Sequence, residues 1–179
     1  MISPDEIYNK VKEYFETADP RTRRPSRFRV SVGGSFYDEK EVQAVLECYF
    51  NGWLSTQKKV IEFENAFAEY IGVPYGVAVN SGSSANLLAL NALLEAGDLK
   101  EGDEVIVPAT TFVTVVSPII QLGLIPVYVD VDPQTLNIDP KEIEKAIQPG
   151  KTKAVMVVHT LGYPADMDAI MGIARANNL

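Results

Sequence analysis

A glycine and several serines follow a short apolar run at residues 80–85, which read NSGSSA. Gly82 lets a ligand approach the backbone closely, and a helix beginning here offers unpaired N–H groups and the positive end of its dipole. Ser83 and Ser84 add hydroxyl donors, so the segment is suited to hold a phosphate. The alternative is a plain helix N-cap with a tight turn. The segment matches neither a P-loop, a GxGxxG fingerprint nor a nucleophile elbow.

Two further segments carry side chains that can contact such a ligand. Phe112 comes shortly after the apolar run 104–107, where an aromatic ring either stacks on a planar group or packs in the core. His159 ends a later apolar run and is the single histidine of the chain. A lone histidine is either a structural residue with satisfied hydrogen bonds or a group that moves protons. The residues alone leave both alternatives open at both positions.

The hydrophobic pattern predicts a fold that positions these segments. Helices are expected at 5–17, 37–51 and 58–70, and Asp38 and Glu41 stand at capping-box spacing at the start of the second. A regular alternation then predicts strands at 75–79, 104–107, 125–129 and 153–159, and helices at 83–96, 112–122, 140–147 and 165–178. Continuous apolar strands separated by helices are typical of an α/β protein with a parallel sheet flanked by helices. Ligands bind such sheets beyond the carboxyl ends of the strands.

The composition of the 179-residue chain excludes several classes of function. A formal net charge of -8 argues against nucleic-acid binding, because phosphate backbones favour basic surfaces. One cysteine, Cys48, and one histidine exclude an internal disulfide and a metal site of several cysteines or histidines. The chain has no continuous apolar membrane span, and its charged start is not a signal peptide. We therefore expect a cytoplasmic protein with no membrane partner.

Two other features carry weaker interpretations. Residues 18–29 read ADPRTRRPSRFR, which predicts an extended basic connector. Its arginines are either solvated or in contact with a phosphate or a partner subunit. Trp53 lies in a loop between two expected helices and is interpreted as a packing residue.

The order of the motifs resembles the DegT/DnrJ/StrS family of fold-type I pyridoxal-phosphate (PLP) enzymes, which act mostly on nucleotide-linked keto-sugars. The motifs read GWLST, VNSGSSANLLAL, GDEVIVPATTFVTVVSPIIQLGLIPVYVDVD and AVMVVHTLGYPADMD, and the resemblance extends from about Gly33 onward. One branch, which includes the lipopolysaccharide-synthesis proteins of the CDP-4-keto-6-deoxyglucose 3-dehydrase type, is similar in the combination of RFRVSVGGSFYDEKEV, SGSSANLLAL, PIIQ-GLIPV-VDV and HTLG. The PADMD stretch is more similar to sugar aminotransferases. The resemblance implies the N-terminal portion of a fold-type I PLP-transferase large domain.

The resemblance also implies roles for individual residues. Gly82, Ser83 and Ser84 match the loop that holds the cofactor phosphate. Phe112 matches the aromatic residue that stacks on the pyridine ring, and His159 matches a histidine close to the cofactor. The implied cofactor is PLP or pyridoxamine 5′-phosphate (PMP), and no metal ligand is expected in this chain.

The sequence departs from the family pattern at two positions. Tyr163 stands where the family often has an amide residue, and Gln57 stands where it usually has a glycine. The aspartate that pairs with the ring nitrogen and the lysine that forms the Schiff base are expected beyond Leu179. No catalytic residue is therefore assigned within the chain.

These features together predict an N-terminal fragment of a PLP-dependent aminotransferase that acts on nucleotide-linked keto-sugars in cell-surface polysaccharide biosynthesis and is inactive alone. A fragment of a PMP-dependent sugar 3-dehydrase and a non-catalytic truncated paralogue are the alternatives. The resemblance implies a nucleotide-sugar substrate, an amino donor and a homodimer. The expected organisation is an N-terminal helix with a basic connector (1–32), a helical segment (33–74) and the first, incomplete part of the PLP-binding α/β domain (75–179).

Overall fold

The computed structural model describes residues 2–18, 37–52, 54, 55 and 58–179. The chain divides into two compact units, residues 1–76 and 77–179, and each is described by itself. The basic connector, Trp53 and Gln57 lie outside the described residues, so their interpretations stay predictions.

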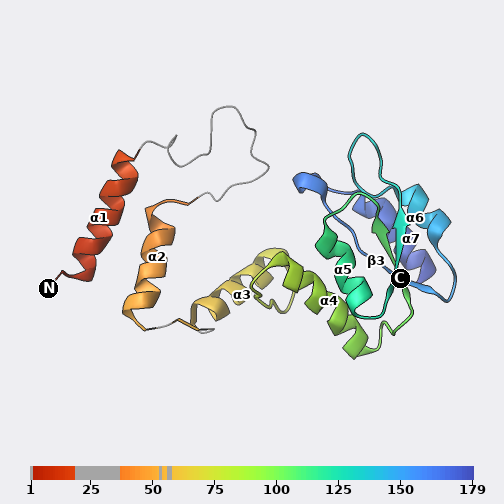
Figure 1. The fold of residues 1–179 in the computed structure, drawn as a ribbon, viewed down its shortest axis with the longest axis horizontal. Coiled ribbons are helices and arrows are strands. Elements are labelled where there is room, and N and C mark those ends of the chain that lie inside the picture. Colours follow the sequence, from red (N-terminus) through yellow and green to blue (C-terminus); the bar gives the residue numbers. More distant parts are fainter. Residues whose placement is uncertain (1, 19–36, 53, 56–57) are drawn as a thin grey trace. The chain divides into compact units, whose positions relative to one another are not determined.

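The described part of the first unit is helical (Figure 1). Its helices are α1 (Pro4–Thr17), α2 (Glu39–Phe50) and α3 (Lys58–Ile71). The predicted capping box of Asp38 and Glu41 begins α2, and Ser3 and Glu6 form a second one before α1. Each box satisfies N–H groups that the first helical turn leaves unpaired. The helices predicted from sequence periodicity in this unit are confirmed.

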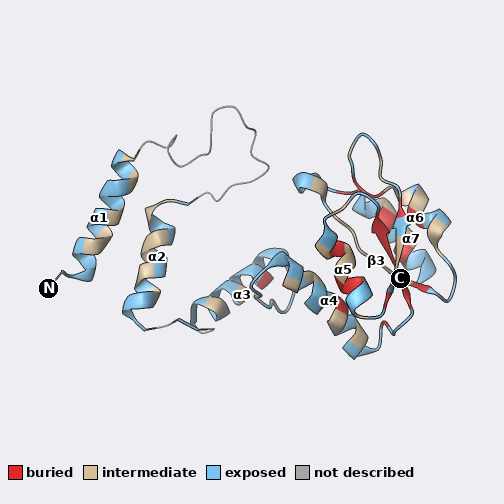
Figure 2. Cartoon of the chain, in the orientation of Figure 1, coloured by how far each residue is buried: buried red, intermediate tan, exposed pale blue. Residues whose placement is uncertain are grey.

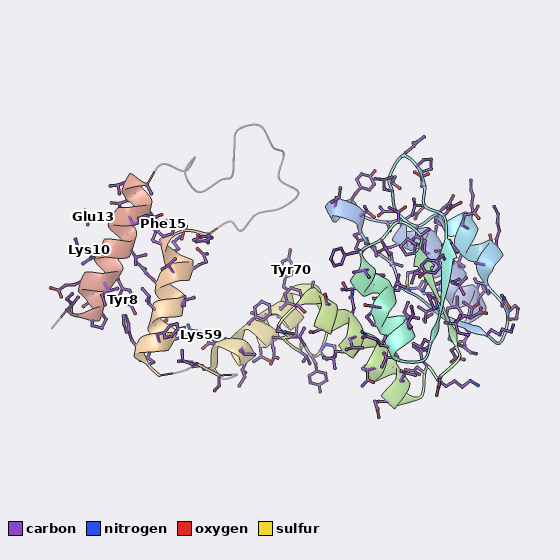
Figure 3. The ribbon with its side chains drawn as sticks, viewed as in Figure 1. Tyr8, Lys10, Glu13, Phe15, Lys59 and Tyr70 are labelled. Carbon is purple, nitrogen blue, oxygen red and sulfur yellow. The ribbon has the colours of Figure 1, made fainter. Side chains whose placement is uncertain are left out.

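Aromatic side chains join α1 to α2. The ring of Tyr8 lies 5.9 Å from that of Phe50, and the ring of Phe15 lies 6.0 Å from that of Tyr37. Tyr8 and Phe15 are labelled on α1 in Figure 3. Aromatic pairs at these distances add to the free energy of apolar burial, so they stabilise the packing of α1 against α2 and against Tyr37, which lies just before α2.

The second unit contains helices packed around a parallel sheet. Its elements in order are α4 (Gly82–Ala96), β1 (Glu104–Pro108), α5 (Val113–Gln121), β2 (Ile125–Val129), α6 (Pro140–Ala146), β3 (Thr152–Val155), the 3-10 turn η2 (Thr160–Gly162) and α7 (Met167–Asn177). The strand order is β2-β1-β3, and both pairings are parallel. The predicted α/β class with a parallel sheet is confirmed.

The central strand β1 is the core of the second unit (red in Figure 2). Val105, Ile106 and Val107 are each 0% exposed. Val105 and Val107 pack in one cluster with residues of α4 and α5, whereas Ile106 packs in a second cluster with residues of α6 and α7. Successive side chains of a strand point to opposite faces of the sheet, so β1 anchors a helical layer on each face.

The strand predicted at 75–79 is wrong. Tyr75 is 85% exposed and Val77 is 71% exposed, and this segment pairs with no strand among the described residues. An apolar run forms a strand only when a neighbouring backbone supplies N–H and C=O partners, and no such neighbour is found in the described part of the chain.

The strand predicted at 153–159 is shorter than expected, because the sheet ladder ends at a proline. Residues Thr152–Val155 form β3, and the Met156 N–H still donates to the Ile106 carbonyl at 2.8 Å. The next ladder bond requires an N–H at residue 108. Pro108 has none, so residues 157–159 leave the ladder and enter a loop.

Helix α5 contains an internal proline, and a side chain from α4 compensates for it. Pro118 has no N–H, so the carbonyl oxygen of Thr114 lacks its usual helical donor. The Nδ2 atom of Asn86 donates to this oxygen at 3.0 Å. The bond joins the second turn of α4 to the first turn of α5, so it holds the N-terminal ends of the two helices together.

We expect the Asn86→Ala variant to lower the free energy of unfolding by about 1 kcal/mol, because the half-buried Thr114 carbonyl loses this donor. Urea unfolding followed by circular dichroism measures the change. Asn91→Ala is the matched control, since Asn91 lies on the same helix and its side chain forms no hydrogen bond in the part of the chain that the structure describes. Equal stability of the two variants would contradict the assignment.

Candidate functional site

The predicted site residues all lie in the second unit, around the carboxyl edge of its sheet. Phe112 follows β1 and His159 follows β3, and these strands are parallel neighbours, so both residues lie at the same edge. The Asn86 bond places the start of α4 beside the first turn of α5. The fold thus brings the three predicted segments to one end of the unit.

The start of α4 has donors that the chain itself does not use. Ser81 is the N-cap residue, and its Oγ accepts from the Ser84 N–H at 3.2 Å. The Ser84 hydroxyl donates to Asn80 Oδ1 at 2.7 Å. In contrast, the N–H groups of Gly82 and Ser83 and the Ser83 hydroxyl have no partner among the described residues. These exposed donors lie at the positive end of the helix dipole, which favours an anion.

Gly82 leaves open space above this backbone. A Cβ atom built at Gly82 meets no atom within 4 Å, and the backbone there is not in the left-handed region. Neither packing nor backbone strain within the described chain therefore explains the glycine. The open approach and the unused donors fit a phosphate group, which is the part of PLP or PMP that the family resemblance predicts at this loop.

Phe112 is exposed rather than buried. It is the N-cap residue of α5, it is 71% exposed, and its ring is not part of either core cluster. The core alternative is therefore wrong, and the ring face is accessible to a planar ligand. The adjacent Thr111 has a buried Oγ1 atom without a hydrogen-bond partner among the described residues. A buried hydroxyl left unpaired costs free energy, so this atom also fits a site that gains a polar group on binding.

His159 makes one hydrogen bond through its ring. Its Nδ1 atom accepts from the Ala165 N–H at 3.0 Å, and Ala165 is buried. The residue is itself exposed and precedes η2. His159 can therefore both stabilise the fold and contact a ligand, since Nδ1 accepts a hydrogen bond within the chain while the residue remains exposed.

Sequence reasoning missed Asn137, which holds the loop after His159. Its side chain is buried, accepts from the Thr160 N–H at 2.9 Å and donates to the Tyr163 carbonyl at 3.0 Å. The available signal was an amide residue between the apolar residues Leu136 and Ile138 in a loop. Tyr163 stands at the departure from the family pattern, and the structure uses its backbone carbonyl.

Asp132 organises the loop that presents Asn137. Its Oδ1 accepts from the N–H groups of Gln134 and Thr135 at 2.8 and 2.9 Å. The hydrogen bonds from the backbone of Thr135 and Gln134 lower the pKa of Asp132, because they stabilise the charged form. The carboxylate is therefore ionised at neutral pH and keeps both bonds.

The described residues supply no sign of a metal or a membrane span. No group of three or more His, Cys, Asp or Glu side chains among them is arranged to hold a metal ion. None of the helices in the described ranges has the length and apolar character needed to cross a bilayer.

We expect the His159→Ala variant to lower the free energy of unfolding by about 1–2 kcal/mol, because the buried Ala165 N–H loses its acceptor. The His159→Asn variant is expected to retain most of the stability, since the Asn Oδ1 can take the place of Nδ1. Thermal unfolding of both variants measures the difference. If both lose the same stability, the hydrogen bond to Ala165 is not the interaction that matters.

The chain resembles several characterised proteins over part of their length. It is 43% identical to the lipopolysaccharide biosynthesis protein RfbH of Salmonella typhimurium, over 98% of this chain and 41% of that protein. It is 42% identical to the GDP-perosamine synthase of Caulobacter vibrioides, over 84% of this chain and 40% of that protein. This chain thus spans about two fifths of the length of these relatives.

A solved structure also matches the fold. The E. coli GDP-4-keto-6-deoxy-D-mannose-3-dehydratase with bound hydrated PLP matches with a TM-score of 0.77 and 36% sequence identity, over 83% of this chain and 38% of that one. The fold is therefore that of the N-terminal part of a PLP-dependent aminotransferase or dehydratase. The DegT/DnrJ/EryC1/StrS aminotransferase profile matches residues 36–179. With its motif order, its parallel sheet and these matches, the chain belongs to the DegT/DnrJ/EryC1/StrS aminotransferase family.

Proposed function

We propose that residues 75–179 form the first part of the cofactor domain of a PLP-dependent aminotransferase that acts on nucleotide-linked keto-sugars in cell-surface polysaccharide biosynthesis. The observation that carries this proposal is the group of unused donors at Gly82 and Ser83, beside open space. The relatives support the substrate class, since their names include a GDP-linked sugar and lipopolysaccharide biosynthesis.

The residues divide the work of holding the cofactor. The Gly82 and Ser83 N–H groups and the Ser83 hydroxyl bind the phosphate, with Ser84 keeping the turn in place through Asn80. The exposed Phe112 ring covers one face of the pyridine ring, and His159 contacts the cofactor near its edge. When bound, the cofactor supplies an electron sink that stabilises negative charge beside the amino nitrogen. The lysine and aspartate that complete the chemistry are expected outside this chain.

A PMP-dependent 3-dehydratase is the second candidate. The match to the E. coli 3-dehydratase, at 36% identity, favours it. The same contacts to the phosphate and the pyridine ring suit both reactions, because both reactions use a cofactor that carries these two groups. The residue that decides between lysine and histidine chemistry is expected beyond Leu179.

The proposal includes the partners that the family resemblance implies. These are a nucleotide-sugar substrate, an amino donor and a second subunit in a homodimer, and the proposed location is the cytoplasm. Nucleic acid is not among the proposed partners, in keeping with the net charge of -8.

We expect PMP to shift the backbone amide NMR signals of Gly82 and Ser83, and the Ser83→Ala variant to bind PMP about 10-fold more weakly, because a hydrogen bond to a charged oxygen is lost. The Ser3→Ala variant is the control, since this serine caps α1 in the other unit. Pyridoxamine without its phosphate should leave both amide signals unchanged. Equal affinity of wild type and Ser83→Ala for PMP would remove Ser83 from the site, and unmoved Gly82 and Ser83 signals would remove the proposed phosphate site.

Incubation with PLP followed by borohydride is expected to modify no single lysine selectively. The lysines of the chain are exposed, except for the half-buried Lys153, so none has the buried setting that activates an amine. Mass spectrometry of peptides after reduction measures the modification at each lysine. A stable adduct at one lysine, absent from the others, would overturn the expectation that the Schiff-base lysine lies outside this chain.

A further inference from the structure

The loop that carries His159 is fixed by the loop before α6. The Thr160 N–H donates to Asn137 Oδ1 at 2.9 Å, and Asn137 Nδ2 donates to the Tyr163 carbonyl at 3.0 Å. The Thr160 hydroxyl also donates to the Leu136 carbonyl at 3.0 Å. These bonds connect residues far apart in sequence, and they hold the loop on both sides of η2.

The two loops adopt backbone conformations that need such support. Leu136 has φ +60° and Leu161 has φ +53°, and neither is a glycine. Residues other than glycine rarely adopt this left-handed backbone conformation, so the surrounding structure must stabilise it. The buried amide of Asn137, 3% exposed, lies between the two positions in the hydrogen-bond network and uses both its oxygen and its nitrogen.

The same loop orients the imidazole ring. Ala165 is 6% exposed and packs in the core cluster with Ile106 and Ile170, so its N–H direction is fixed by the core. That N–H donates to His159 Nδ1 at 3.0 Å. An imidazole nitrogen accepts a hydrogen bond only when it carries no proton. The neutral ring therefore carries its proton on Nε2.

We propose that Asn137 is a positioning residue that keeps His159 in the Nε2–H form, so that the ring offers a ligand one hydrogen-bond donor and no acceptor. The group that it contacts is then a hydrogen-bond acceptor, namely an anionic or carbonyl oxygen of the cofactor or substrate. The tautomer follows from the bonds within the chain, whereas the contact with a ligand oxygen rests on the proposed function. Asn137 acts through the loop, since its amide bonds Thr160 and Tyr163 and not the imidazole.

The single histidine makes the tautomer directly measurable. In protein labelled with 15N-histidine, every imidazole nitrogen signal comes from His159. At a pH where the ring is neutral, the wild-type chain without ligand is expected to give an unprotonated Nδ1 signal and a protonated Nε2 signal. The Asn137→Ala variant is expected to move both signals toward the mixed values of free histidine, because the loop no longer holds the ring against Ala165.

Two further variants keep the test decisive. Asn137→Asp retains an oxygen for the Thr160 N–H but loses the donor to Tyr163, so its signals should lie between those of wild type and Asn137→Ala, and it serves if the alanine variant does not fold. Asn91→Ala, an asparagine substitution on α4, should leave the wild-type signals unchanged. Wild-type imidazole signals in a folded Asn137→Ala or Asn137→Asp variant would overturn the positioning role, and a protonated Nδ1 in the wild type would overturn the tautomer.

Addition of PMP tests the contact with the ligand. If the proposal holds, PMP shifts the His159 Nε2 signal of the wild type together with the Gly82 and Ser83 amides, and shifts Nε2 less in Asn137→Ala. Amide shifts without any change at Nε2 would overturn the ligand contact while leaving the phosphate site intact. Absence of all PMP shifts would contradict the proposed function and the ligand contact, whereas the tautomer measurement without ligand would still stand.

Discussion

The pairing of β1 with a parallel strand on each side is the constraint on which the second unit depends. β1 is the central strand, and its residues Val105 to Val107 are 0% exposed. The segment is therefore buried on both faces of the sheet and contributes to both core clusters. Because both neighbours are parallel to β1, the loops that follow the strands leave at the same edge. The positions of Phe112 and His159 follow from that geometry, and the Asn86 bond to Thr114 adds the start of α4.

Polar groups near the sheet are satisfied by hydrogen bonds from other segments of the unit. At the amino edge, the Thr152 hydroxyl donates to the buried Glu104 carboxylate at 2.9 Å and accepts from the Gln148 N–H at 2.9 Å. At the carboxyl edge, Asn137 plays the equivalent part for the backbone of η2. A buried polar group without a partner is costly, so these bonds select the loop conformations as well as stabilise them. Thr111, whose buried Oγ1 lacks a partner in the described residues, contrasts with this pattern.

Local patterns were sufficient to predict the helices and the α/β class with a parallel sheet, but not the strand pairings. The capping box at Asp38 and the apolar runs of β1 and β2 depend on neighbouring residues, and both were predicted correctly. Pro108 limits the length of β3 because the register of β1 and β3 places it where the next N–H donor is needed. The sequence alone does not reveal this register. The segment 75–79 has a strand-like composition, yet a strand needs a partner that local composition does not reveal.

The residues of the candidate site likewise differ in how far the sequence alone could identify them. The glycine and serines at the start of α4 were recognisable because their role depends on local backbone geometry. Phe112 was ambiguous, since an aromatic residue after a strand is common both in cores and in ligand sites, and only its 71% exposure removes the core alternative. Asn137 was missed because its role depends on contacts with Thr160 and Tyr163, more than 20 residues away. The roles of the site residues toward a cofactor stay predictions.

The open backbone at the start of α4 has a consequence for how such a site changes during evolution. Two of its donors are main-chain N–H groups, at Gly82 and Ser83. A substitution cannot remove a main-chain N–H unless it introduces proline, although a bulky side chain at Gly82 would obstruct the approach. Anchoring by the backbone therefore tolerates drift in the surrounding side chains. In the proposed phosphate site, the surrounding side chains, and with them the reaction, can therefore diversify while the main-chain contacts to the phosphate are retained.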